Sequence, residues 1–189
     1  VGLNPTRAGL LAVLRQMGGS IEALDPREVG GEPVADLRVR HSALHGVEVD
    51  PALAPAMIDE FPALFVAAAL ASGTTTTSGL DELRVKESDR LAAMAAALTL
   101  AGAQVNETSD GLTIHGTGGD PLPGTPEGAA VTTCLDHRIA MSMAVAGLAS
   151  RDGVRVDDTR PIATSFPDFP ALIDAALGAE PSLSPGSTP

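Results

Sequence analysis

Residues 80–94 read LDELRVKESDRLAAM and contain Lys86, the only lysine in a chain of 189 residues. Seven of the ten residues that end at Arg90 are charged, and an apolar, alanine-rich run follows at once. This change predicts a helix that starts near Glu87 or Ser88, either of which could cap it. Lys86 and Arg90 would then lie at the positive end of the helix dipole, which stabilises anions rather than cations.

Two interpretations of these cations stay open from the charges alone. An anion bound at the helix N-terminus would explain them, because the unpaired backbone N–H groups there bind anions. Alternatively, the residues form a solvated cluster of ion pairs, with Asp81 and Glu82 against Arg84 and with Glu87 against Arg90.

A polar start followed by an apolar helix recurs along the chain. Residues 58–80 and 135–157 each begin with an aliphatic residue and an aspartate, which is Asp59 or Asp136. About three turns of apolar helix, an Ala-Ser pair and a short β-prone stretch follow in both. The two aspartates lie 77 residues apart, and each suits a helix N-cap.

A second pattern interleaves with the first. Residues 3–22, 85–107 and 162–180 each combine a polar start, an amphipathic helix and a glycine near the C-cap. Together the two patterns predict a unit of about 80 residues with two helices and several short strands. The first unit lacks its leading buried helix, so we expect the chain, which begins at Val1, to be truncated there.

The remaining elements follow from local signals. Asn4 with Pro5, and Ser165 with Asp168, are expected to cap two further helices. Residues 117–130 are expected to form a loop, and residues 181–189, rich in proline and serine, a flexible tail. Strands are expected at 73–80, 103–108, 111–116 and 153–157, with more within 31–50.

Composition narrows the classes of partner. The net charge of −12 argues against nucleic acid and anionic membranes, since both need a basic face. No apolar run reaches bilayer length and no signal peptide is visible.

Cys134 is the only cysteine, which excludes an internal disulfide and a metal–thiolate cluster and favours a cytoplasmic location. We interpret Cys134 as a buried structural thiol. The histidines without metal-ligand spacing are read as surface or strand residues: His41, His45 and His115.

A second charged cluster, Asp136-His137-Arg138, opens another apolar helix and again places cations at a helix start. If the repeats bring the helix starts to one side, these cations form a local anion trap on an acidic protein. Asp59 would lie at the same end and could accept a hydrogen bond from a substrate hydroxyl. We therefore expect four residues at one end of the domain, with the two arginines facing an open surface: Asp59, Glu87, Arg90 and Arg138.

Two of these stretches, LRVKESDRL at 83–91 and LDHRIAM at 135–141, resemble signature stretches of the C-terminal half of the EPSP synthase family. Three more match that family in the same order: NPTRAGLL at 4–11, MIDEFPALFVAAA at 57–69 and IATSFPDF at 162–169. The resemblance is strongest to the bacterial class II branch. It implies that residues 1–180 form a C-terminal enolpyruvyl transferase domain, incomplete at its N-terminus, and that 181–189 form a tail.

The resemblance also implies a fold and an activity. The fold is α/β, an inside-out α/β barrel domain built from pseudo-threefold βαβαββ repeats, of which the first is truncated here. The reaction transfers the enolpyruvyl group of phosphoenolpyruvate to the 5-hydroxyl of shikimate 3-phosphate and releases phosphate, without a metal or cofactor. This is a step of aromatic amino acid biosynthesis and the target of glyphosate. The isolated half is expected to be inactive, because both substrates also need the N-terminal domain.

Family resemblance assigns a role to each candidate residue. Asp59 would hold and help to deprotonate the 5-hydroxyl, and Glu87 would carry the proton to the methylene carbon. Lys86 would be catalytic as well: it would contact the shikimate hydroxyl region and support charge transfer. Arg90 and Arg138 would grip the phosphoenolpyruvate carboxylate, which suits their bidentate geometry.

His137 and Asp136 would support these arginines. One position departs from the family, since Thr164 stands where many members carry a lysine, which puts a phosphate contact there in doubt.

Two alternatives to the EPSP synthase assignment stay open. One is half of a UDP-N-acetylglucosamine enolpyruvyl transferase, which the stretch RVKESDR disfavours. The other is a non-catalytic, repeat-built binding module.

Overall fold

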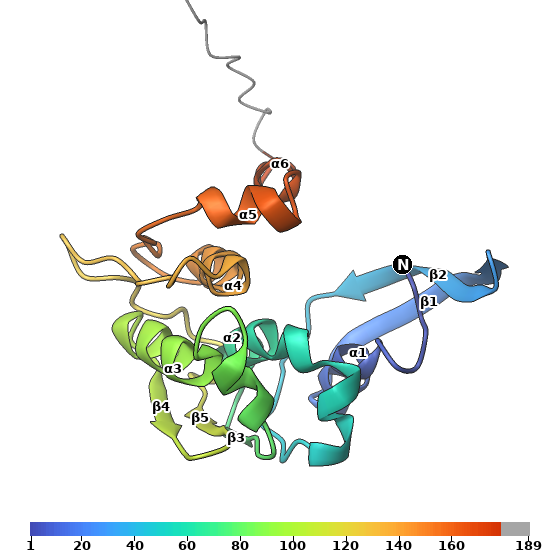
Figure 1. Ribbon diagram of the computed structural model, residues 1–189, viewed down its shortest axis with the longest axis horizontal. Coiled ribbons are helices and arrows are strands. Elements are labelled where there is room, and N and C mark those ends of the chain that lie inside the picture. Colours follow the sequence, from blue (N-terminus) through green and yellow to red (C-terminus); the bar gives the residue numbers. More distant parts are fainter. Residues whose placement is uncertain (179–189) are drawn as a thin grey trace, which may run out of the picture.

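The structure, a computed structural model, describes residues 1–178, so the expected tail at 181–189 lies outside it. Helices and strands are interspersed along the chain as far as β5, and three α-helices follow (Figure 1). The α-helices are α1 (Gly9–Gln16), α2 (Phe61–Leu70), α3 (Arg90–Leu100), α4 (His137–Leu148), α5 (Arg160–Ser165) and α6 (Phe169–Ala176). The strands are β1 (Ser20–Val29), β2 (Glu32–Arg40), β3 (Thr74–Thr76), β4 (Gln104–Glu107) and β5 (Leu112–His115). Three 3₁₀ helices connect them: η1 (Pro51–Ala56), η2 (Ile58–Glu60) and η3 (Asp81–Val85).

The core forms around α2, which is apolar on every side. Seven of its ten residues are buried, as expected of a helix that lies inside a domain. α2 packs against α4, against α3 and against β5, and Leu64, Leu98 and Met143 are among the fully buried side chains between them. In Figure 1 the small sheet lies below α2 and α3, while α4 and then α5 and α6 lie above. The predicted three-turn helices after Asp59 and Asp136 are thus confirmed.

β3, β5 and β4 form an antiparallel sheet in that order, against the α2–α3 layer. The chain passes very close to itself beside this sheet. A Cβ at Gly111 would lie 1.9 Å from the carbonyl oxygen of Thr77, so only glycine fits there. The strand expected at 73–80 is shorter than predicted, because it ends at Thr76.

The predicted period of about 80 residues is visible in the backbone. Isolated parallel bridges join His45 to Ser72 and Leu122 to Ser150, at matching places after α2 and α4. Each of three helices also ends on a glycine in the left-handed region: Gly18 (φ 95°), Gly102 (φ 96°) and Gly178 (φ 69°). The strand expected at 153–157 is wrong; only a single bridge, Val131 to Val156, forms there.

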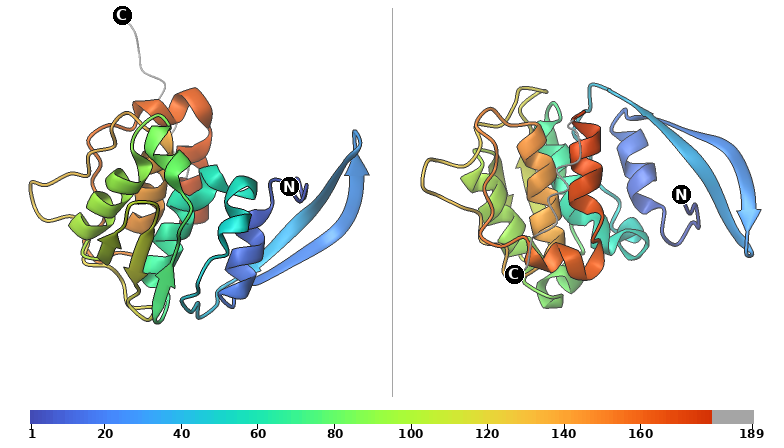
Figure 2. Two further views of the ribbon diagram at one scale, coloured as in Figure 1. Left: turned by 60° about the horizontal axis from the view of Figure 1, so that its bottom comes forward. Right: turned by 90° about the horizontal axis from the view of Figure 1, so that it is seen from above.

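β1 and β2 form a long antiparallel hairpin that projects from the body of the domain (Figure 2). Its tip is Gly30-Gly31, both with positive φ, the backbone that a two-residue hairpin loop requires. Nearly all its residues are exposed or half-buried; Ala35 alone in the hairpin is fully buried. β2 falls within the expected 31–50 region, whereas β1 was not predicted.

Several expected helix caps are wrong. Asn4 accepts a bond from Thr6 N–H, five residues before α1 begins. α3 is capped by Asp89, whose carboxylate accepts from Ala92 N–H, and not by Glu87 or Ser88. The expected Ser165–Asp168 pair forms no side-chain cap, because Ser165 ends α5.

Candidate active site around Arg90

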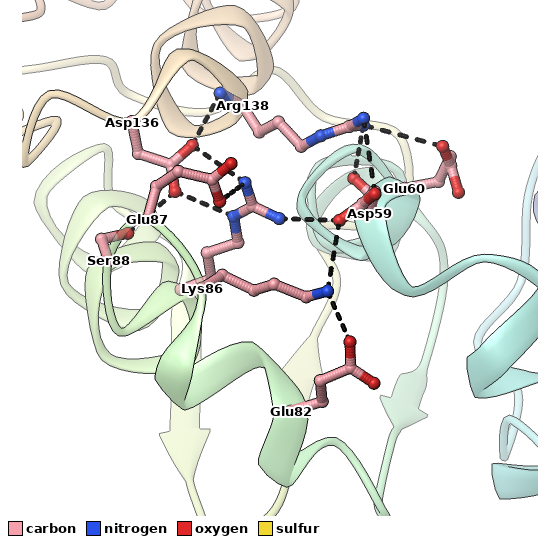
Figure 3. A network of polar contacts seen from close by, with 9 residues as sticks. Asp59, Glu60, Glu82, Lys86, Glu87, Ser88, Asp136 and Arg138 are labelled. Carbon is pink, nitrogen blue, oxygen red and sulfur yellow. Dashed lines mark hydrogen bonds and ion pairs between the residues drawn. The ribbon is translucent and has the colours of Figure 1, made fainter.

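Arg90, the first residue of α3, is the most deeply buried cation among the described residues, with 1% of its surface exposed. Three carboxylates surround its guanidinium. Nε donates to Asp136 Oδ2 at 2.8 Å, Nη1 donates to Asp59 Oδ1 at 2.9 Å, and Nη2 donates to Glu87. We call these four residues the Arg90 junction. It joins the stretches before α2, α3 and α4 (Figure 3).

This pairing explains why a charged arginine can sit in the core. Desolvation is costly, and it is offset only where hydrogen-bonded opposite charges surround the group. Burial lowers the pKa of Arg90, but the hydrogen bonds and charges of Asp136, Glu87 and Asp59 outweigh it and raise the pKa above its ordinary value. Arg90 therefore stays protonated at any physiological pH.

Asp136 is the buried counterpart of Arg90, with 0% exposure. Its carboxylate also accepts from Ser88 Oγ at 2.9 Å and from Arg138 N–H at 2.9 Å, so it caps α4 as predicted. Burial alone would raise the pKa of the Asp136 carboxyl. The bonds from Arg90, Arg138 and Ser88 and the charge of Arg90 hold the pKa below its usual value.

Two further cations border the junction and are partly accessible. Lys86 Nζ donates to Glu82 and lies 4.0 Å from Asp59 Oδ1. Its pKa is raised by the hydrogen bond to Glu82, against the opposing effect of burial. Arg138 Nη1 donates to the Asp59 carbonyl at 2.8 Å, and its Nη2 lies 3.8 Å from Asp59 Oδ2. Asp59 thus lies among three cations (Figure 3).

A groove of about 220 Å³ opens beside Arg138 and Asp59. Its polar end is formed by Asp59, Glu60 and Arg138. Its walls are apolar and come from α2, α4 and the α5–α6 segment: Ala63, Met141, Val145, Phe166 and Phe169, with Ser142. The junction therefore has one side that a small molecule can reach.

The structure brings six of the candidate residues together: Asp59, Lys86, Glu87, Arg90, Asp136 and Arg138. The expectation that both arginines face an open surface is wrong for Arg90, because its guanidinium is buried among carboxylates. The Arg138 side chain is 29% exposed. Within residues 1–178 the His137 ring forms no hydrogen bond to Arg138, so its supporting role stays a prediction.

Neither interpretation of the charged stretch at 80–94 describes the cluster fully. The cluster has three cations, and it has five carboxylates because Glu60 and Glu82 add to the three of the Arg90 junction. Negative charge therefore exceeds positive charge, and the cluster as a whole is not the cationic trap we expected. Of the expected ion pairs, Glu87 with Arg90 forms. Arg84 pairs instead with Asp89 and Glu107.

Cys134, expected to be buried, is exposed, because a left-handed turn carries it outward before α4. Among the described residues no cluster of His, Cys, Asp and Glu is suited to a metal ion. No described helix has the length and apolarity to cross a bilayer.

Sequence reasoning missed three residues that bear on the junction. Glu82 stands four residues before Lys86, a spacing that favours ion pairs and could have indicated the contact. Glu60 follows Asp59 and lies 3.6 Å from Arg138 Nη1. Nothing in the sequence pointed from Ser88 to Asp136, 48 residues away.

The Arg90 junction joins the starts of three helices in an α/β domain. The stretches that form these helix starts are the ones that resemble the EPSP synthases. The chain belongs to the EPSP synthase family: the family's sequence model, described as EPSP synthase (3-phosphoshikimate 1-carboxyvinyltransferase), matches residues 1–173.

Individual relatives agree with this assignment. Over 176 residues the chain is 75% identical to a 3-phosphoshikimate 1-carboxyvinyltransferase of Novosphingobium aromaticivorans, covering 93% of this chain and 40% of that protein. It is 57% identical over 180 residues to the protein of that name in Zymomonas mobilis, covering 95% of this chain and 40% of that protein.

The fold agrees as well. A solved structure of EPSP synthase from Acinetobacter baumannii superposes with a TM-score of 0.87 and 42% identity, covering 93% of this chain and 40% of that chain. The expected α/β EPSP synthase-like fold is thereby confirmed. The chain spans about 40% of the length of the curated relatives it matches.

Proposed function

We propose that this chain supplies the C-terminal part of a 3-phosphoshikimate 1-carboxyvinyltransferase and that residues 1–180 form its C-terminal domain. The substrates are phosphoenolpyruvate and shikimate 3-phosphate, bound together with the portion of the relatives that this chain does not span. The observation that carries the proposal is the Arg90 junction, in which the family's two signature stretches meet around one guanidinium.

The first half of the reaction needs two proton movements, and the second half reverses one of them. The substrate hydroxyl loses a proton as its oxygen bonds to C2 of phosphoenolpyruvate, and C3 gains a proton as the double bond opens. In the second half C2–O(phosphate) breaks, C3 gives up a proton, and the double bond reforms. A group beside the hydroxyl and a group beside C3 are therefore required.

Asp59 suits the first of these tasks. Its side chain is 33% exposed, so a ligand can reach it, and Lys86 and Arg138 both border it. Its carboxylate oxygens are hydrogen-bond acceptors, which is what contact with a substrate hydroxyl requires.

Glu87 suits the second task. Its side chain is 52% exposed, while its carboxylate touches the buried guanidinium of Arg90. A carboxyl group that is anchored at one side and accessible at the other can carry a proton to and from a substrate carbon.

Arg138 is the better placed of the two arginines to hold the phosphoenolpyruvate carboxylate. It borders the groove, whereas Arg90 has carboxylate partners at Nε and at both Nη atoms. We assign Arg90 chiefly to holding Asp59 and Glu87 in place, which modifies the role that the family resemblance implied for it.

A reconstituted protein tests the proposal. The chain would be joined to the complementary portion of the Novosphingobium relative, and phosphate release from phosphoenolpyruvate would be measured with and without shikimate 3-phosphate. We expect turnover only in the joined protein and only with both substrates. Absence of phosphate release from a folded joined protein would contradict the proposal, as would turnover by the chain alone.

Substitutions in the joined protein then test the roles. Glu87→Gln removes the titratable proton and should lower kcat by about 10²-fold. Arg138→Lys loses the bidentate fork and should mainly raise KM for phosphoenolpyruvate. Asp81→Asn is the matched control, because this exposed carboxylate in the same stretch has no bonded partner within residues 1–178. Wild-type turnover in Glu87→Gln would remove Glu87 from the mechanism.

A further inference from the structure

The turn that leads into α4 is strained. Cys134 and Leu135 have φ values of 54° and 57°, and within residues 1–178 the one other non-glycine residue with positive φ is Asp25 in the hairpin. This backbone conformation is unfavourable for a residue that carries a side chain, and it persists only where its surroundings fix it. Packing of the turn itself does not fix it, since Cys134 is exposed and Leu135 is 68% exposed.

The turn is closed by one backbone bond, from Asp136 N–H to the Thr133 carbonyl at 2.9 Å. Two successive positive φ values inside such a bond are the pattern of a type I′ turn, which favours Asn-Gly and not Cys-Leu. The corresponding entrance to α2 has no such turn, because neither Met57, with φ −154°, nor Ile58 has a positive φ. The strain occurs at the entrance whose aspartate is the buried partner of Arg90.

Asp157 holds the other end of this turn. Its Oδ1 accepts from Thr133 N–H at 2.9 Å and from Thr133 Oγ1 at 2.7 Å, and Thr133 is 0% exposed. Asp157 is itself tied in place, because its N–H donates to the Val131 carbonyl at 2.9 Å. A continuous chain of bonds therefore runs from Asp157 through Thr133 and the turn to Asp136 and Arg90.

We propose that Asp157 is a positioning residue of the Arg90 junction: by fixing Thr133, it holds the left-handed turn that aims Asp136 at Arg90. Asp157 touches none of the reacting groups assigned above. A catalytic role for Asp157 rests on the proposed function, because the Arg90 junction is the proposed site. The position of Asp136 that this role predicts can be measured without turnover.

The readout is the Nε–H proton of Arg90, which donates to Asp136 Oδ2 inside the core. In the ¹⁵N-labelled chain its signal would be assigned by its loss in Arg90→Lys, and its exchange with solvent would be followed by NMR. A loss of global stability speeds this exchange only through the unfolded population, so each exchange rate is compared with the free energy of unfolding of the same variant. A displaced Asp136 frees the proton directly.

Three variants define the expected result. Asp157→Ala removes the acceptor and should speed Arg90 Nε–H exchange at least tenfold. Asp157→Asn keeps one acceptor oxygen for Thr133 and should stay within about threefold of wild type. Asp158→Ala is the matched control, because its carboxylate bonds only to exposed Arg160, and it should leave the rate unchanged.

A rescue separates this role from simple loss of stability. Cys134→Asn/Leu135→Gly supplies the residues that a type I′ turn prefers, so the turn should no longer need Asp157. Added to Asp157→Ala, it should return the exchange rate to within about threefold of wild type. Alone, it should raise the midpoint of thermal unfolding. Should Asp157→Ala not fold, recovery of a folded chain by the same pair supports the proposal.

An unchanged exchange rate in a folded Asp157→Ala chain overturns the proposal. Failure of the Asn-Gly pair to rescue, or a lowered midpoint when the pair is added to wild type, overturns it as well. None of these measurements involves substrate, so their failure leaves the proposed reaction standing. Absence of turnover in the joined protein leaves the positioning role untouched.

Discussion

Replacing Asp136 with alanine should destabilise the chain more than removal of any exposed charge. Asp136 is 0% exposed and pairs with Arg90, itself 1% exposed. Removing one partner of a buried pair costs about 3–5 kcal/mol, and the lower end applies because Asp59 and Glu87 still neutralise Arg90. Loss of the cap on α4 adds about 1 kcal/mol. The expected cost is therefore about 4 kcal/mol.

Urea unfolding followed by circular dichroism measures this cost as a free energy of unfolding. For a domain of this size, 1 kcal/mol shifts the thermal midpoint by about 2–4 °C, so the midpoint should fall by about 8–16 °C. Asp136→Asn keeps an oxygen for the α4 cap and should cost about 1 kcal/mol less than alanine. Asp81→Ala removes an exposed carboxylate that has no hydrogen-bond partner within residues 1–178, and it should leave the midpoint unchanged.

A double-mutant cycle tests the cause of the loss. If the cost comes from the lost pairing with Arg90, Asp136→Asn should cost about 1 kcal/mol or less in an Arg90→Met background, a coupling of about 2 kcal/mol. Additive costs would refute the reasoning. A midpoint for Asp136→Ala equal to that of the exposed control would refute it too.

Three other measurements probe the same fold. Thr75→Val should raise the free energy of unfolding by about 1 kcal/mol, because the buried Oγ1 of Thr75 has no hydrogen-bond partner among the described residues. Gly111→Ala should lower it by about 3 kcal/mol or more, since its Cβ would meet Thr77 O, whereas Gly2→Ala, with nothing within 4 Å, should not. The lowered pKa of Asp136 gives stability that is complete above about pH 5 and is lost as the pH falls through the folded-state pKa, which lies below the ordinary value of about 3.9. The thermal midpoint should therefore fall between about pH 5 and pH 3, and less steeply in Asp136→Asn.

Local signals in the sequence predicted the elements that depend on local physics. The apolar runs after Asp59 and Asp136 gave the helices α2 and α4, and the glycines near the helix ends gave the period. The hairpin strand β1 was missed because Pro26 and a left-handed Asp25 interrupt any alternation in it. The Gly30-Gly31 pair between two β-prone runs was the signal that could have revealed it.

The candidate site could be predicted as a set of residues but not as a geometry. The cations were placed correctly at helix entrances, yet the sequence does not show which carboxylates converge on Arg90. Asp59 resembled a cap and instead pairs with Arg90, since η2 rather than α2 begins beside it. The contact between Asp157 and Thr133 joins residues 24 apart, and no pattern of spacing marks it.

The Arg90 junction also has a consequence for how the chain reaches its native state. The carboxylates that neutralise Arg90 stand 3, 31 and 46 residues away in sequence. Closing the two longer loops costs entropy before any ion pair offsets it, and burying the guanidinium with one carboxylate alone would be unfavourable. Contacts between such distant stretches raise the contact order of the chain, so we expect the junction to form after the local helices. The site that it holds would then be complete only once all three stretches have met.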